Sequence, residues 1–119
     1  MKLTGKCKED FEKWVISNKI NQEILEVDSI DFYGSYDLYD LLDKLPLSCK
    51  FGVYVDFFDS VGIRILIDMD FENEVYDKFV LYIEYKKHCF CNYGMNFKTR
   101  PEARTEAVKM ANEIYTLNK

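Results

Sequence analysis

The residues best suited to metal or thiol chemistry are one histidine, His88, and the cysteines Cys7, Cys49, Cys89 and Cys91. On a strand, Cys89 and Cys91 would share one face and His88 would point the other way, whereas structural zinc sites generally use Cys-x2–4-Cys pairs. We therefore expect the thiols to be reduced and packed or partly exposed, with no metal. The chain has a single histidine, no Gly-x-Ser-x-Gly motif and no glycine-rich phosphate loop. We therefore expect no catalytic residues and no cofactor.

Carboxylates near a lysine offer a second chemistry. Asp68 and Asp70 end one apolar run, and Glu84 stands two residues before Lys86 in the next. An Asp on one strand followed by Glu-x-Lys on another resembles the catalytic pattern of the restriction-endonuclease-like superfamily, over about 20 residues. The resemblance implies a metal-dependent nuclease, in which carboxylates hold a divalent cation and the lysine orients water. The alternative is an ordinary ion pair between Glu84 and Lys86 on a solvated strand face.

Negative charge is concentrated in the middle of the chain. Residues 21–77 hold fourteen Asp and Glu against three basic residues, whereas both flanking segments are net basic and the whole chain carries −5. Such a pattern bears on partners and solubility. It favours a basic protein partner over direct nucleic-acid binding, since spaced carboxylates can imitate a phosphate backbone with one charge per about 1.7 Å. The alternative is a solvated face that keeps the protein soluble.

The predicted partner-binding surface combines these acids with two tyrosines. Tyrosine supplies rigid contact area with a polar tip, which suits protein recognition. The candidate residues are Asp37, Asp40, Asp43, Asp56, Asp59, Asp68, Asp70, Glu72, Glu74, Asp77, Tyr36 and Tyr39. In size, acidity and aromatic content, the chain resembles the small accessory proteins of bacteriophages and mobile elements. The resemblance implies a non-catalytic inhibitor that mimics nucleic acid and blocks a basic host enzyme, one that handles nucleic acid.

Two amphipathic helices are expected before the acidic strands. Apolar residues at helical spacing predict a first helix over 4–17, and the stretch 24–33 fits either a strand or a helical turn. A leucine stripe predicts a second helix over 36–44. Pro46 should end that helix, because the residue before a proline avoids the helical conformation.

Alternating apolar residues then predict three strands over 51–58, 63–70 and 79–86, the third with an option to continue to Cys91. The segment 59–62 between the first two is expected to be a hairpin connection. Together the runs describe an antiparallel meander with one buried and one wetter face.

A last helix is expected over 100–117. Thr99 and Glu102 have the spacing of a capping box, and Pro101 occupies a permitted position in the first turn. The expected apolar stripe is Ala103, Ala107, Met110, Ile114 and Leu117. We therefore predict a single α+β domain over residues 1–119, in which a three-stranded antiparallel meander packs against helices in the order α-α-β-β-β-α. No apolar run is long enough to span a membrane, so we expect no membrane partner and a cytoplasmic protein.

Helix, three-stranded meander and helix is also the order of elements in double-stranded-RNA-binding domains. The segment 99–111 is similar to the final helix of that family, and the match would cover about residues 36–117. The resemblance implies a phosphate-binding role for Lys98, Arg100 and Arg104. Glu102 interrupts this basic cluster, which favours a degenerate module that keeps the topology without the binding.

Overall fold

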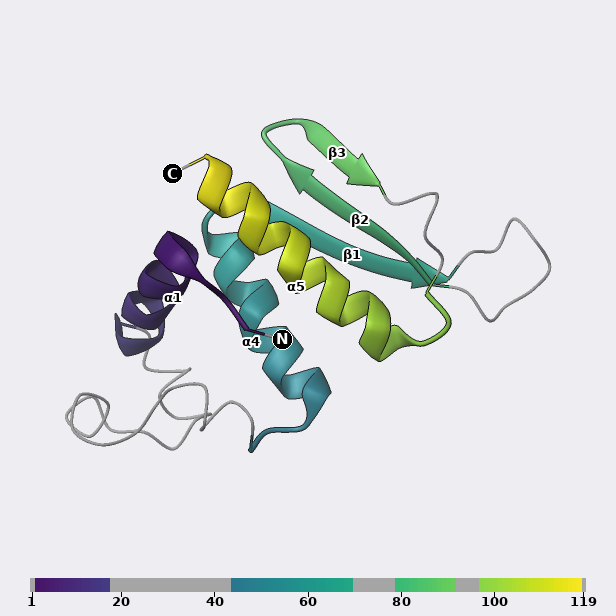
Figure 1. Cartoon of the computed structure of the whole chain (residues 1–119), viewed down its shortest axis with the longest axis horizontal. Helices are drawn as coiled ribbons and strands as arrows, with labels where there is room; N and C mark the ends of the chain where they lie inside the picture. Colours follow the sequence, from purple (N-terminus) through teal and green to yellow (C-terminus); the bar gives the residue numbers. More distant parts are fainter. Residues whose placement is uncertain (1, 18–43, 70–78, 92–96, 119) are drawn as a thin grey trace.

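The computed structural model describes residues 2–17, 44–69, 79–91 and 97–118. Its elements are α1 (Gly5–Ser17), α4 (Leu47–Ser60), β1 (Ile63–Met69), β2 (Phe79–Tyr85), β3 (His88–Cys91) and α5 (Arg100–Leu117) (Figure 1). The strands form an antiparallel sheet in the order β1-β2-β3, so the expected α+β class and order of elements are confirmed. None of the helices in these ranges is long and apolar enough to cross a membrane.

The helix α4 corrects the prediction of a strand over 51–58 and a hairpin over 59–62. Its buried side chains recur every three or four residues, as expected for one face of a helix. They are Lys50, Val53, Tyr54, Phe57 and Phe58. Apolar residues in this segment fit a period of two as well as a helical period, and packing against the rest of the domain selects the helix.

Pro46 stands at the start of a helix. It occupies the N-cap of α4, and its carbonyl accepts hydrogen bonds from the N–H groups of Cys49 and Lys50 at 3.0 and 3.1 Å. A proline is tolerated there because the first N–H groups of a helix have no partner within the helix. Gly62, with φ of 84°, supplies the left-handed conformation that turns the chain into β1. The helix expected over 36–44 and the ambiguous stretch 24–33 lie outside the described residues.

A tight turn separates the strand predicted over 79–86 from the segment up to Cys91 to which it had the option of continuing. Tyr85 pairs with His88, so Lys86 and Lys87 alone connect β2 to β3. Both lysines have positive φ, 48° and 67°, as a two-residue turn of the primed type requires. Such turns favour Asn-Gly, so two lysines give the sequence no sign of a turn at this point.

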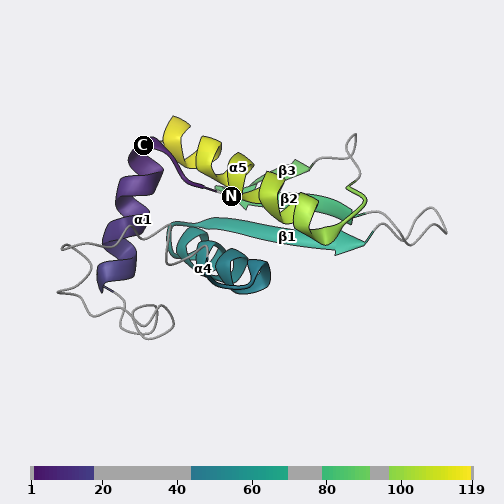
Figure 2. The same ribbon diagram turned by 60° about the horizontal axis from the view of Figure 1, so that its bottom comes forward.

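The buried face of the sheet, here called the inner face, is formed by alternate residues of β1 and β2. It comprises Ile63, Ile65, Ile67, Leu81 and Ile83, which belong to or pack against the hydrophobic core. The helix α5 packs across β1 and β2, and α4 packs against β1 and α5 (Figure 2). The alternation predicted for the second and third runs is therefore confirmed.

The helix α5 begins as its sequence predicts. Thr99 is the N-cap, and its hydroxyl oxygen accepts the N–H of Glu102 at 3.3 Å. The buried face is built from small and branched residues and one aromatic residue, namely Ala103, Ala107, Val108, Ala111, Ile114 and Tyr115. Leu117 was expected in this stripe but is 86% exposed, because it lies at the last turn beyond the sheet.

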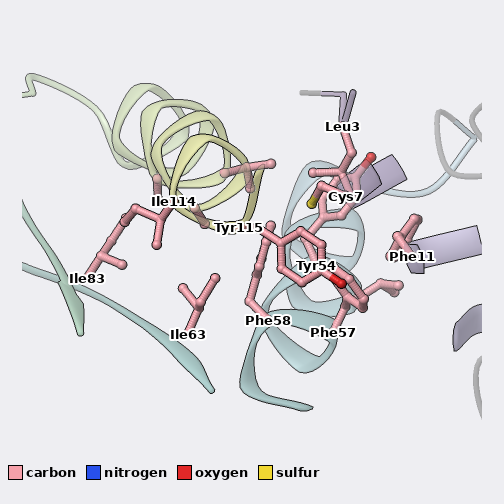
Figure 3. Close-up of a cluster of buried hydrophobic side chains, with 14 of the residues drawn as sticks. Leu3, Cys7, Phe11, Tyr54, Phe57, Phe58, Ile63, Ile83, Ile114 and Tyr115 are labelled. Atoms are coloured by element: carbon pink, nitrogen blue, oxygen red, sulfur yellow. The ribbon is translucent and has the colours of Figure 1, made fainter. Parts of the chain in front are cut away.

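An aromatic cluster joins α1, α4 and α5. The Phe57 ring of α4 lies 5.3 Å from Phe11 and 5.7 Å from Trp14 of α1, and 5.9 Å from Tyr115 of α5, measured between ring centroids. Figure 3 shows Phe57 beside Tyr54, with Phe11 and Tyr115 turned toward them. Edge-to-face and tilted aromatic pairs of this kind add to the stabilisation from burial.

Polar contacts also hold α1 on α5. The N–H of Thr4 donates to Oδ1 of Asn112 at 2.9 Å, and Nδ2 of Asn112 donates back to the Thr4 hydroxyl at 3.1 Å. The Tyr115 hydroxyl donates to the Asp10 carboxylate, which also pairs with Lys6 at 2.9 Å. The Tyr115 hydrogen bond and then Lys6 lower the pKa of Asp10, while burial and that same bond raise the pKa of Tyr115.

Candidate functional site

The face of the sheet opposite the helices, here called the outer face, carries the other half of the strand side chains. Because successive residues of a strand point to opposite sides, Arg64, Leu66 and Asp68 face away from the core that Ile65 and Ile67 enter. The pairs on this face across β1 and β2 are Arg64–Glu84, Leu66–Tyr82 and Asp68–Val80, and Cys89 of β3 lies opposite Glu84. Val80 is buried, whereas the rest of this face is half-buried or exposed.

A hollow of about 750 Å³ opens on the outer face beside the end of α4. Its lining residues are Asp59, Arg64, Ile65, Leu66, Tyr82, Glu84 and Cys89. Leu66 is 58% exposed, which is unusual for a leucine in the middle of a strand. A concave surface of this size that combines apolar and aromatic side chains with a few polar ones is typical of a binding site.

Charged side chains line the hollow beside Leu66 and Tyr82. Arg64 and Glu84 lie directly opposite each other, yet the structure records no ion pair between these two described residues. Asp59 adds a second carboxylate, so the three ionised groups sum to a negative charge. Two carboxylates and a guanidinium in one hollow can therefore contact charges on a bound molecule.

Three of the predicted partner-binding residues fall in the described part of the chain. Asp56 and Asp59 are exposed on α4, not on a strand and a hairpin as expected, and Asp59 lines the hollow. Asp68 is exposed on the outer face, as the alternation of β1 predicts. The other nine lie outside the described residues: Asp37, Asp40, Asp43, Asp70, Glu72, Glu74, Asp77, Tyr36 and Tyr39.

The prediction from sequence omitted two side chains that line the hollow. Leu66 and Tyr82 were not among the candidates, because these were chosen for negative charge or for tyrosine within the acidic segment. The signal was present in the strand pattern: once Ile65 and Ile67 are assigned to the core, Leu66 must face the solvent. An apolar residue on the wetter face of a strand is an informative departure from the pattern.

The structure does not bring together Asp68, Glu84 and Lys86 of the nuclease hypothesis. Asp68 lies opposite Val80, whereas Glu84 lies opposite Arg64, which is four residues before Asp68 in β1. At about 3.3 Å per residue, the two backbones are about 13 Å apart along the sheet, too far for carboxylates that share one cation at about 2–2.6 Å. Lys86 stands in the turn, with its ammonium 5.2 Å from the ring centroid of Tyr85. Within the described residues no cluster of three metal-binding side chains occurs. Asp70 lies outside the described residues.

Cys7 and Cys49 lie on separate helices, and Cys89 and Cys91 both lie on β3. Cys7 is buried in α1, and burial raises the pKa of its thiol to about 12, so it is unsuited to nucleophilic chemistry. Cys49 is exposed at the start of α4, and Cys89 is exposed on the outer face. His88 pairs with Tyr85 in the inner row, while Cys89 lies in the outer row, so their expected orientation to opposite faces is confirmed.

Arginines at the start of α5 are held against aromatic rings. The guanidinium of Arg100 lies 5.2 Å from the ring centroid of Phe79, and that of Arg104 lies 5.4 Å from Phe51. Lys98 is exposed beside them. The helix–meander–helix order is present from α4 to α5.

Comparison with protein-family models, curated proteins and solved structures finds no match.

Proposed function

We propose that this protein is a non-catalytic protein-binding module that engages a basic partner through the hollow on its outer face. The observation that carries the proposal is the exposure of Leu66 in a hollow that Asp59, Arg64 and Glu84 also line. Protein interfaces commonly have an apolar or aromatic centre surrounded by polar residues, and Leu66 with Tyr82 has that composition.

The charge of the chain supports a basic partner. Asp59 and Glu84 at the hollow belong to a chain of net charge −5, most of whose acids fall between residues 21 and 77. Complementary charge speeds encounter with a positively charged protein and disfavours acidic ones. We extend the proposal to a protein that handles nucleic acid, which an acidic surface would inhibit by occupying its nucleic-acid groove, as a phage-type inhibitor does.

The test compares matched variants for capture of proteins from a host lysate on the immobilised chain. Leu66→Ser removes the exposed apolar side chain from the hollow, and Leu117→Ser is its control, because Leu117 is 86% exposed on α5. Burial of a leucine contributes about 1.5–3 kcal/mol. Covering the 58% of Leu66 that is exposed contributes about 1–1.5 kcal/mol, equivalent to about a tenfold change in Kd.

A captured basic protein should be lost with Leu66→Ser and retained with Leu117→Ser, and salt should release it from the wild type. Equal capture of the protein by the wild type and by Leu66→Ser would refute a binding site at the hollow. Wild-type binding to double-stranded RNA that is lost with Arg100→Glu would instead favour the RNA-binding alternative. Cleavage of nucleic acid that depends on a divalent metal would favour the nuclease hypothesis.

A further inference from the structure

The side chains of the outer face form three rows across β1 and β2. The first row holds Arg64 and Glu84, with Asp59 of α4 at the same hollow. The second row holds Leu66 and Tyr82, and the third holds Asp68 opposite Val80. Rows are two residues apart along a strand, which is about 6.6 Å. The outer face thus runs from net negative charge, through an apolar and aromatic row, to a further negative charge.

A helix matches this spacing without needing backbone partners from the sheet. Residues four apart on one face of a helix are separated by about 6 Å along its axis, close to the separation of the rows. The N–H and C=O groups of a helix are satisfied internally, whereas a strand lying on side chains would leave its own unpaired. A helix on a sheet face is also a standard way for two layers to bury apolar surface.

Building on the proposed function, we propose that the hollow binds a helical segment of the partner with an apolar residue flanked by Lys or Arg four residues to either side. The apolar residue contacts Leu66 and Tyr82. One cation lies beside Glu84 and Asp59, where two carboxylates outnumber the guanidinium of Arg64. The other lies toward Asp68, which is exposed at the far row.

The experiment uses a fluorescently labelled, alanine-rich synthetic helix with Lys, Leu and Lys at positions i, i+4 and i+8. A control peptide of the same composition carries both lysines on the opposite face. Binding to the full chain is followed by fluorescence anisotropy at low and at high salt. On the protein, Glu84→Lys is matched by Glu113→Lys, since Glu113 is exposed on α5 and gives the same change in net charge. Leu66→Ser is again matched by Leu117→Ser.

We expect the aligned peptide to bind at least about threefold more tightly than its control, since exposed ion pairs are individually weak. Glu84→Lys should weaken binding by about three- to tenfold and Leu66→Ser by about tenfold, with little effect from the control variants. Equal binding of the two peptides, or binding that is unaffected by Leu66→Ser, would overturn the helical arrangement.

The peptide and lysate experiments separate this inference from the function on which it rests. If neither peptide binds but a lysate protein is captured in a way that depends on Leu66, the protein-binding function stands and the helical segment is refuted. If neither the peptides nor any protein depend on Leu66 and Glu84, both are refuted. Circular dichroism of each variant verifies that it is folded before binding is compared.

Discussion

Removing the Tyr115 hydroxyl should loosen the attachment of α1 to the rest of the domain. This hydroxyl donates a hydrogen bond from α5 to the Asp10 carboxylate of α1, and the Tyr115 residue is only 4% exposed. Tyr115→Phe keeps the ring and its packing against Phe57 but deletes the donor. The variant therefore isolates one charge-assisted hydrogen bond between two helices that are far apart in sequence.

The cost follows from the surroundings of Asp10. A hydrogen bond to a charged group contributes about 1.5–3 kcal/mol to the free energy of unfolding. The Asp10 side chain is 22% exposed and still pairs with Lys6 at 2.9 Å, so water and Lys6 continue to solvate the carboxylate in the variant. We therefore expect a loss near the lower limit, about 1.5 kcal/mol, or a decrease in Tm of about 6 °C for a domain of this size.

The effect should depend on pH in one direction. Because the Tyr115 bond lowers the pKa of Asp10 in the folded state, the bond contributes fully above the unfolded pKa of 3.8 and is lost as the pH falls through the lower folded pKa. Urea denaturation followed by circular dichroism at neutral pH and below pH 3.8 measures this. The difference between wild type and Tyr115→Phe should shrink in acid.

A double-mutant cycle provides the control for the same assay. Asp10→Asn should remove most of the effect of Tyr115→Phe, whereas Glu9→Gln, which neutralises an exposed acid on the same helix, should leave it unchanged. A pH-independent difference, or an equal effect of Tyr115→Phe in the Asp10→Asn background, would refute the assignment of this energy to the hydrogen bond.

Two further predictions concern the core and the hairpin. Phe57→Ala should cost about 3–5 kcal/mol, because the buried ring contacts aromatic residues of three helices, and Phe57→Leu should cost less than about 2 kcal/mol. Chemical denaturation measures both, and a similar loss in the two variants would contradict a cavity as the cause. Lys86→Asn with Lys87→Gly should stabilise the domain by about 1 kcal/mol, because both lysines have positive φ. An unchanged or lower Tm would show that the turn carries no such strain.

The last helix was predictable because several independent signals agree. The spacing of Thr99 and Glu102, Pro101 in the first turn and small residues at helical spacing all indicate a start at residue 100, where α5 begins. The first helix was likewise predicted over 4–17 and occupies Gly5–Ser17. Each of these two helices has one apolar face, and its apolar residues do not also alternate with the two-residue period of a strand.

The segment before the sheet was mispredicted because its composition supports two structures. Phenylalanine and valine at 51, 53, 55 and 57 alternate as in a strand, and such residues favour strands. The helical stripe through Val53, Tyr54 and Phe57 uses the same residues, and only contact with α1 and α5 distinguishes the two. Pro46 and Gly62 at the ends of a single helix were the signals that could have decided it.

The candidate site was predictable only in part. Its acids were identified by charge, and Asp59 and Asp68 lie where a partner could contact them. The hollow itself depends on how the end of α4 lies beside the sheet, a long-range arrangement that the local sequence does not encode. Leu66 could have been found from strand alternation alone, had apolar residues on the wet face been sought together with charged ones.

The attachment of α1 to α5 has a consequence for the order in which the chain folds during synthesis. Thr4 forms a hydrogen bond with Asn112, 108 positions later, and Asp10 accepts one from Tyr115, 105 positions later. The helix that leaves the ribosome before the others therefore has its docking surface completed only when α5 has emerged. Until then α1 lacks its hydrogen-bond partners Asn112 and Tyr115, although Phe11 and Trp14 can already contact Phe57 of α4, and closing so long a loop is slow. A chaperone that shields apolar segments of nascent chains should find its binding site in α1, and release should follow the emergence of Tyr115.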